Sequence, residues 1–185
     1  MLESEKPSLA APAVFRWEPP PPPLRWIKLN VDAAVAESSS ALAVVARDDK
    51  GTVSKACSKT HHPCPPIVAE ANAILWAAQL AIQEQWLHII IEGDAKRCID
   101  SLFVEDVLPD WSIANLVCSI LNLKVGFVQC CFHWVKRVSN SAAHVTAKLS
   151  LATSESFCYD KDNLPSCPLC LFGRLSLYTF RLNKS

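Results

Sequence analysis

The first third of the chain shows strand-like patterns. Residues 27–32 alternate apolar and polar side chains, which predicts a strand with one polar face. An apolar run at residues 41–47 predicts a second strand, and residues 52–59 predict a third. Residues 48–51 have the composition of a tight turn. Two short connections in succession predict an antiparallel meander of three strands.

The middle of the chain changes to a helical period. The prolines within residues 63–66 are tolerated at a helix start, and the apolar segment after them predicts a helix over about residues 67–84. The short apolar run at residues 88–92 predicts a buried strand. Residues 93–94 then turn the chain into a second helix that is predicted to end at about Val104.

Two more helices and one more strand are predicted after that point. Residues 111–123 place apolar side chains on one helix face, residues 127–135 predict a strand, and Asn140 can cap a helix over residues 141–151. The order of elements is therefore β-β-β-α-β-α-α-β-α. Three antiparallel strands followed by two parallel crossovers predict an α/β fold, with a five-stranded mixed sheet flanked by helices.

Two segments outside these patterns mark the ends of the predicted domain. Residues 19–23 are all proline, so residues 1–24 are predicted to be a tail or linker outside the core. Residues 153–185 show no periodicity and are predicted to form an irregular or disordered tail. The predicted domain therefore spans residues 25–152 of the 185-residue chain.

Charge and composition restrict the possible functions. The chain has 18 Lys and Arg residues and 18 Asp and Glu residues, so nucleic-acid binding would need a local basic patch. No apolar run reaches the ~18 residues of a membrane helix. The first residues lack the apolar core of a secretory signal. We therefore expect an intracellular protein that contacts no membrane and keeps most of its nine cysteines reduced.

Three acidic residues lie where a charge is unexpected. Glu70 falls on the helix face of Ile74 and Ala77, which should pack on the sheet, and an unpaired buried carboxylate is costly. Asp32 ends the polar face of the first strand, and Asp94 follows the fourth strand. The ordinary alternatives are a first-turn acid for Glu70, a solvated strand face for Asp32 and a helix N-cap for Asp94. Acids that converge from separate elements repel one another unless a divalent cation lies between them.

Five blocks of sequence resemble, in order, a ribonuclease H-like domain. The resemblance covers about residues 26–151 and is greatest to the plant branch, which is related to the ribonuclease H region of non-LTR retroelement reverse transcriptases. The blocks are Lys28–Ala34 (KLNVDAA), Arg47–Gly51 (RDDKG), Ala69–Ala77 (AEANAILWA), Ile91–Ala95 (IEGDA) and Phe132–Ala147 (FHWVKRVSNSAAHVTA).

The resemblance implies a metal-dependent nuclease. In this family two Mg²⁺ ions are held by acids at the positions that Asp32, Glu70 and Asp94 occupy here, and carboxylate oxygens suit this hard cation. The implied reaction, with Mg²⁺ or Mn²⁺, is endonucleolytic hydrolysis of the RNA strand of an RNA–DNA hybrid, leaving a 5′-phosphate and a 3′-hydroxyl. The fourth catalytic position falls on His144, as it often does in plant relatives. Imidazole suits Mn²⁺ better than Mg²⁺, and the alternative for His144 is a surface residue without a role.

The resemblance also implies residues that contact nucleic acid. Basic side chains would contact phosphates, and amides would contact sugar hydroxyls. The candidates are Lys96, Arg97, His133, Lys136 and Arg137 for phosphates, and Asn30 and Asn140 for sugars. The alternative for each basic residue is a solvated side chain.

One departure from the family leaves a second function open. The family usually has glycines near the first aspartate and in the second strand, where Ala33, Ala34, Ala41 and Ala43 stand here. Because glycine allows nucleic acid to approach the backbone, these methyl groups could obstruct a substrate. A catalytically inactive nucleic-acid-binding domain on the same fold is therefore the alternative to a nuclease.

No other cofactor is predicted. Cys167 and Cys170 have CxxC spacing, but the sequence has no second such pair to complete a zinc site. We expect a monomer whose partner is an RNA–DNA hybrid and which needs no small-molecule cofactor.

Overall fold

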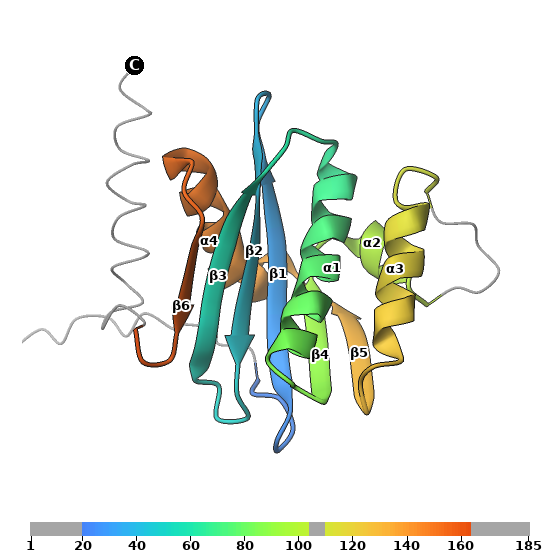
Figure 1. The fold of residues 1–185 in the computed structure, drawn as a ribbon, viewed down its shortest axis with the longest axis vertical. Coiled ribbons are helices and arrows are strands. Elements are labelled where there is room, and N and C mark those ends of the chain that lie inside the picture. Colours follow the sequence, from blue (N-terminus) through green and yellow to red (C-terminus); the bar gives the residue numbers. More distant parts are fainter. Residues whose placement is uncertain (1–19, 104–109, 164–185) are drawn as a thin grey trace, which may run out of the picture.

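A mixed six-stranded sheet forms the centre of the computed structural model, which describes residues 20–103 and 110–163 (Figure 1). The strands are β1 (Ile27–Val35), β2 (Ser40–Arg47), β3 (Val53–His61), β4 (His88–Gly93), β5 (Gln129–Trp134) and β6 (Phe157–Asp160). Their order across the sheet is β5-β4-β1-β2-β3-β6. The first three strands form the predicted antiparallel meander, and β4 and β5 run parallel to β1.

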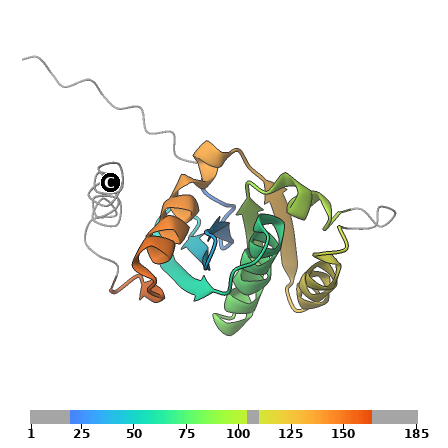
Figure 2. The same cartoon turned by 90° about the horizontal axis from the view of Figure 1, so that it is seen from above.

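Helices cover both faces of this sheet, as predicted. They are α1 (Pro66–Gln83), α2 (Lys96–Asp100), α3 (Ala114–Lys124) and α4 (Ser141–Thr153), with a 3-10 turn, η1 (Arg137–Asn140), before α4. α1 and α3 lie on one face and α4 lies on the other (Figures 1 and 2). α2 is shorter than predicted, and Val104 lies outside the described residues. No helix within residues 20–103 and 110–163 has both the length and the apolar character needed to cross a membrane.

Alternation along β1 places its side chains in two different environments. Leu29 and Val31 pack with Ile74 of α1 in the main core. The opposite face of β1 points toward α4, where Ala34 and Ala43 pack in a smaller apolar cluster. Ala43, like Ala41, is fully buried, so these methyl groups fill the interior beneath α4.

The sixth strand corrects the predicted domain boundary. β6 pairs antiparallel with β3, and Cys57 and Cys158 face each other in this pairing and form a disulfide. The prediction of an irregular tail from residue 153 is therefore wrong for residues 157–160. Cys57 and Cys158 are exceptions to the prediction that most cysteines are reduced. Cys167 and Cys170 lie outside the described residues.

The proline run is also more than a linker. Pro22 is buried, and the backbone oxygen of Pro20 accepts a 2.8 Å hydrogen bond from the Lys28 ammonium group. The prediction that residues 1–24 lie outside the core is therefore wrong for the end of that segment, while residues 1–19 lie outside the described residues.

Candidate metal centre

Three carboxylates converge at one edge of the sheet. Asp32, Glu70 and Asp94 each offer an oxygen, and these oxygens all lie within 4.8 Å of one another. Asp32 lies toward the end of β1 and Asp94 directly follows β4, so the parallel pairing of these strands brings both acids to the same edge. Glu70 reaches this edge from α1, where its carboxylate accepts a hydrogen bond from the backbone N–H of Ala33. The predicted convergence of the three acids is confirmed.

The ordinary explanations for these acids do not apply. Glu70 lies beyond the first turn of α1, which contains no acidic residue. Asp32 is only 1% exposed, so it does not belong to a solvated strand face. Ala95, and not Asp94, is the N-cap of α2, and no side chain caps that helix.

Burial and mutual repulsion make a fully ionised cluster unfavourable. Burial, followed by the charges of Glu70 and Asp94, raises the pKa of Asp32 to about 9. Burial, followed by the charge of Asp94, raises the pKa of Glu70 to about 8. A divalent cation would offset both effects, because it neutralises charge and bonds carboxylate oxygens directly. The donor set therefore fits a hard cation such as Mg²⁺ or Mn²⁺.

His144 contacts this cluster from α4. Its Nδ1 shares a 2.9 Å hydrogen bond with Oδ2 of Asp32, and Nη2 of Arg137 lies 3.0 Å from the same Nδ1. Burial, followed by the charges of Arg137 and Lys148, lowers the pKa of His144, which favours a neutral imidazole at neutral pH. His144 is therefore hydrogen-bonded to one of the three acids, Asp32, and is not an isolated surface residue.

The predicted phosphate contacts lie on exposed positions, but two of them have acidic partners. The exposed residues are Lys96, Arg97, His133, Lys136 and Arg137. Lys96 pairs with Asp100 at 2.6 Å, and Arg97 pairs with Asp110 at 2.9 Å. Both pairs are solvent-accessible, and such pairs contribute little stability, so a phosphate could compete for either side chain.

The two candidate amides are instead fully buried. Asn30 donates to Glu92 at 3.1 Å and accepts from Arg47 at 2.9 Å, so its amide is used within the fold. The predicted contact between Asn30 and a sugar hydroxyl does not fit this position. Asn140 donates to the backbone oxygen of Val31 at 2.7 Å and makes no side-chain cap on α4. Its Oδ1 atom has no hydrogen-bond partner among the described residues.

Two further residues, Trp134 and Gly93, support the acids, and the sequence did not single them out. The indole N–H of Trp134 donates a 3.1 Å hydrogen bond to the backbone oxygen of Asp94. Gly93 packs so closely on β1 that a Cβ atom there would lie 3.3 Å from a methyl group of Val31. Trp134 and Gly93 both stand in the sequence blocks that carry the family resemblance, which is the signal that could have identified them.

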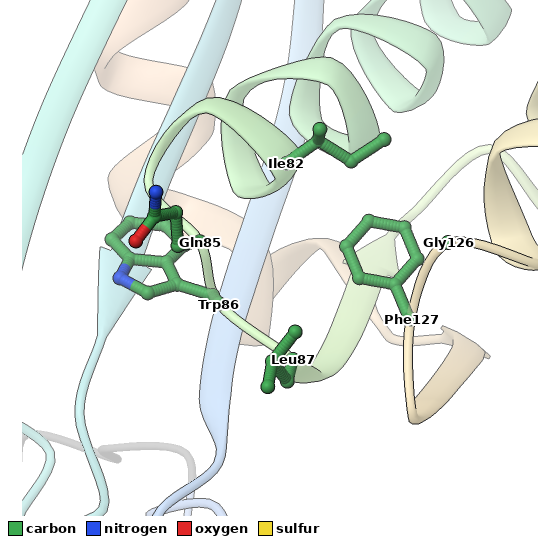
Figure 3. A pocket seen from close by; sticks show the side chains of 6 residues that line it. All are labelled: Ile82, Gln85, Trp86, Leu87, Gly126 and Phe127. Carbon is green, nitrogen blue, oxygen red and sulfur yellow. The ribbon is translucent and has the colours of Figure 1, made fainter.

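The structure also contains a hollow of about 360 Å³, shown in Figure 3, which none of the three acids lines. It is lined by Ile82, Gln85, Trp86, Leu87, Gly126 and Phe127. These residues lie at the end of α1 and just before β4 and β5, whereas the acids lie where β1 and β4 end. No titratable side chain lines the hollow, so it is not part of the candidate metal centre.

The fold is that of ribonuclease H-like proteins. Ribonuclease H1 from the halophilic archaeon Halobacterium salinarum NRC-1 superposes with a TM-score of 0.65 and 19% identity, over 69% of this chain and 98% of that chain. LC11-RNase H1 in complex with an RNA/DNA hybrid gives 0.62 and 18%, over 69% and 98%. The prototype foamy virus protease-reverse transcriptase gives 0.51 and 14%, over 70% of this chain and 20% of that chain.

The amino-acid sequence also matches a known protein family. Residues 30–150 match the family model described as reverse transcriptase-like, and the chain belongs to this family. No curated protein sequence matches the chain.

Proposed function

We propose that this chain is a divalent-metal-dependent ribonuclease of the plant reverse-transcriptase-related type, which hydrolyses the RNA strand of RNA–DNA hybrids. The observation that carries the proposal is the convergence of three acids from separate elements, with no basic side chain forming an ion pair with Glu70 or Asp94 among the described residues. LC11-RNase H1, a protein with the same fold, is seen with an RNA/DNA hybrid, which supports this substrate class.

The acids and their neighbours have different proposed roles. Asp32, Glu70 and Asp94 hold Mg²⁺ or Mn²⁺, which supplies a Lewis acid for phosphodiester hydrolysis when bound. His144 orients the Asp32 carboxylate through their shared hydrogen bond. Trp134 fixes the backbone at Asp94 from the adjacent strand. These positioning contacts reduce the freedom of two of the three proposed ligands.

The proposed nucleic-acid contacts come from the end of β5, from the segment that joins β5 to α4, and from α2. His133 of β5 and Lys136 and Arg137 of the following segment are exposed and would contact phosphates. Lys96 and Arg97 of α2 would join them by exchanging their surface acidic partners for phosphate. The net charge of the whole chain is zero, so this local group supplies the attraction.

A catalytically inactive nucleic-acid-binding domain is the second candidate. The observation that favours it is the contact of His144 with Asp32 and with Arg137, which places a non-acidic side chain at the fourth catalytic position of the family. The alanines that replace family glycines give it less support, because Ala41 and Ala43 are buried and cannot obstruct a substrate at the surface.

A cleavage assay with the full chain separates the two candidates. The probe is an RNA–DNA hybrid labelled on the RNA strand, with Mg²⁺ or Mn²⁺, and the Asp32→Asn and Asp100→Asn proteins serve as inactive and matched surface variants. We expect cleavage by wild type and Asp100→Asn and none by Asp32→Asn. Salt-sensitive binding of the hybrid without cleavage in either metal would instead establish the inactive binding domain.

A further inference from the structure

Arg137 places a fixed positive charge beside the carboxylates. It begins η1, and its Nη2 atom lies 3.0 Å from Nδ1 and 3.2 Å from Nε2 of His144. The same Nδ1 lies 2.9 Å from Oδ2 of Asp32. A chain of contacts therefore joins a guanidinium group, which is always charged, to the most buried of the three acids.

The charge of Arg137 acts on the whole cluster. Its guanidinium lies one imidazole ring away from Asp32, and the oxygens of Asp32, Glu70 and Asp94 lie within 4.8 Å of one another, so one positive charge is close to all three acids. Arg137 therefore already supplies part of the positive charge that the acids need. A positive group at this place opposes any further cation that approaches from the side of α4.

Charge balance limits how many divalent ions the cluster can hold. Three metal-bound carboxylates carry three negative charges, and the guanidinium of Arg137 carries one fixed positive charge. One divalent ion brings the sum to zero, whereas two would leave two positive charges in a partly buried site. Oδ2 of Asp32 is also occupied by its hydrogen bond to His144, which leaves this oxygen less available to a second ion.

We propose that Arg137, held against His144, takes the place of a second metal ion, so that the chain binds one divalent cation between Asp32, Glu70 and Asp94. The inference rests on the proposed function, because it assumes that this cluster holds the metal. It differs from the family pattern, in which two ions share the site. Arg137 is then a positioning residue and counter-charge in addition to a phosphate contact.

Counting bound Mn²⁺ tests the proposal without any cleavage assay. The bound ions are measured by calorimetric titration and by the electron paramagnetic resonance signal of free Mn²⁺, using the full chain and a circular dichroism check of folding. We expect one ion for wild type, one for Arg137→Lys, and two for the protein carrying both Arg137→Gln and His144→Asp. Lys148→Gln is the matched control, because it removes a positive charge one helical turn from His144, and it should still bind one ion.

The outcomes distinguish this inference from the proposed function. Two ions bound to wild type would overturn the one-ion inference and leave the nuclease proposal intact. One ion bound to the double variant would show that Arg137 and His144 do not exclude the second ion, which also overturns the inference. No bound Mn²⁺ in folded wild type, at concentrations that saturate a ribonuclease H1, would contradict both proposals.

Discussion

β1 carries two groups of buried polar side chains: Lys28 and Asn30 in its first half, which have partners within the fold, and Asp32 in its second half, which lies among other acids. On the face of β1 toward α4, Lys28 and Asn30 lie at the start of the strand, and Asp32 follows two residues later. Lys28 pairs with Glu92 at 3.0 Å, and Asn30 bonds to both Glu92 and Arg47. Each charge in this first group therefore has a partner of opposite sign or a hydrogen bond supplied by the chain itself.

The second group is compensated only in part: Asp32 and Glu70 each have a hydrogen bond, but three acids lie together, and among the described residues no acid of the group forms an ion pair with a Lys or Arg side chain. Asp32 lies beside Glu70 and Asp94, and the guanidinium of Arg137 contacts His144 rather than Asp32 itself. The difference shows how to separate a structural buried charge from a functional one. A buried ion pair that the fold completes is a structural feature, whereas a buried charge that the fold leaves in excess indicates a ligand of opposite charge.

Asp32→Asn should have the largest effect and should act in opposite directions on activity and stability. Cleavage of the hybrid should fall by roughly 10³-fold or more in either metal, because a metal ligand is lost. The metal-free protein should become more stable by about 1–3 kcal/mol at neutral pH, because Asn avoids the cost of protonating the Asp32 carboxyl, whose pKa rises from 3.8 to about 9 on folding. Initial rates and denaturant unfolding measure the two changes. A loss of stability in the metal-free state would contradict the view of Asp32 as an uncompensated charge.

Glu92→Gln should show the reverse behaviour in the first group. Removing this carboxylate leaves the buried Lys28 without its partner, so we expect a loss of about 3–5 kcal/mol in the free energy of unfolding. The loss should be the same with and without Mg²⁺, since Glu92 lies outside the acidic cluster. Urea unfolding measures it, and adding Lys28→Met should restore part of the stability. A loss below about 1 kcal/mol would mean that water reaches Lys28.

The pH dependence of the free energy of unfolding should reveal the acids of the second group, Asp32 and Glu70, in the metal-free protein. In the metal-free fold the pKa of Asp32 is raised from 3.8 to about 9 and that of Glu70 from 4.5 to about 8. The folded state therefore holds more protons than the unfolded state between these limits, and stability should fall as pH rises from about 4 to 9. Thermal melting at several pH values should show this slope, a smaller slope in Glu70→Gln, and little slope with saturating Mn²⁺. A flat profile without metal would contradict the proposed repulsion.

His144→Asp should have the smallest effect. A carboxylate at this position adds a negative charge and an oxygen donor, which Mg²⁺ prefers to nitrogen. We expect the Mg²⁺ concentration that gives half-maximal cleavage to fall by a few fold, with less change for Mn²⁺. An unchanged Mg²⁺ requirement would show that His144 acts only by orienting Asp32.

The strands and helices of the main domain were predictable because each strand buries one face and each helix buries one stripe of apolar side chains, which leaves a regular pattern in the sequence. Alternation revealed β1, and the helical period over α1 revealed Glu70 as an acid on an apolar face. β6 was not predictable in the same way, since four residues carry too little pattern and their partner, β3, lies far away in the sequence. The pairing of Cys57 with Cys158 depends on that strand, so it was missed for the same reason.

The candidate site was predictable as a set of residues but not as a set of contacts. The three acids stood out by residue type and position, and their convergence followed from parallel strands ending at one edge. The contacts of His144 with Asp32 and Arg137 depend on side-chain orientation around η1, which no local pattern encodes. Asn30 was offered as a sugar contact by the family resemblance, and alternation could not correct this, because it does not distinguish a solvated polar face from a buried polar network.

The pairing of β6 with β3 also bears on how the protein avoids self-association. A long outer strand such as β3 presents unpaired N–H and C=O groups to which another chain can add, and repeated addition of this kind leads to fibrils. β6 occupies these groups over Lys55–Ser58, and the new outer strand is only four residues long. Its short length gives an incoming strand few backbone partners. The last described strand therefore acts as a covalently attached cover over this edge of the sheet, whereas β5 forms the opposite edge.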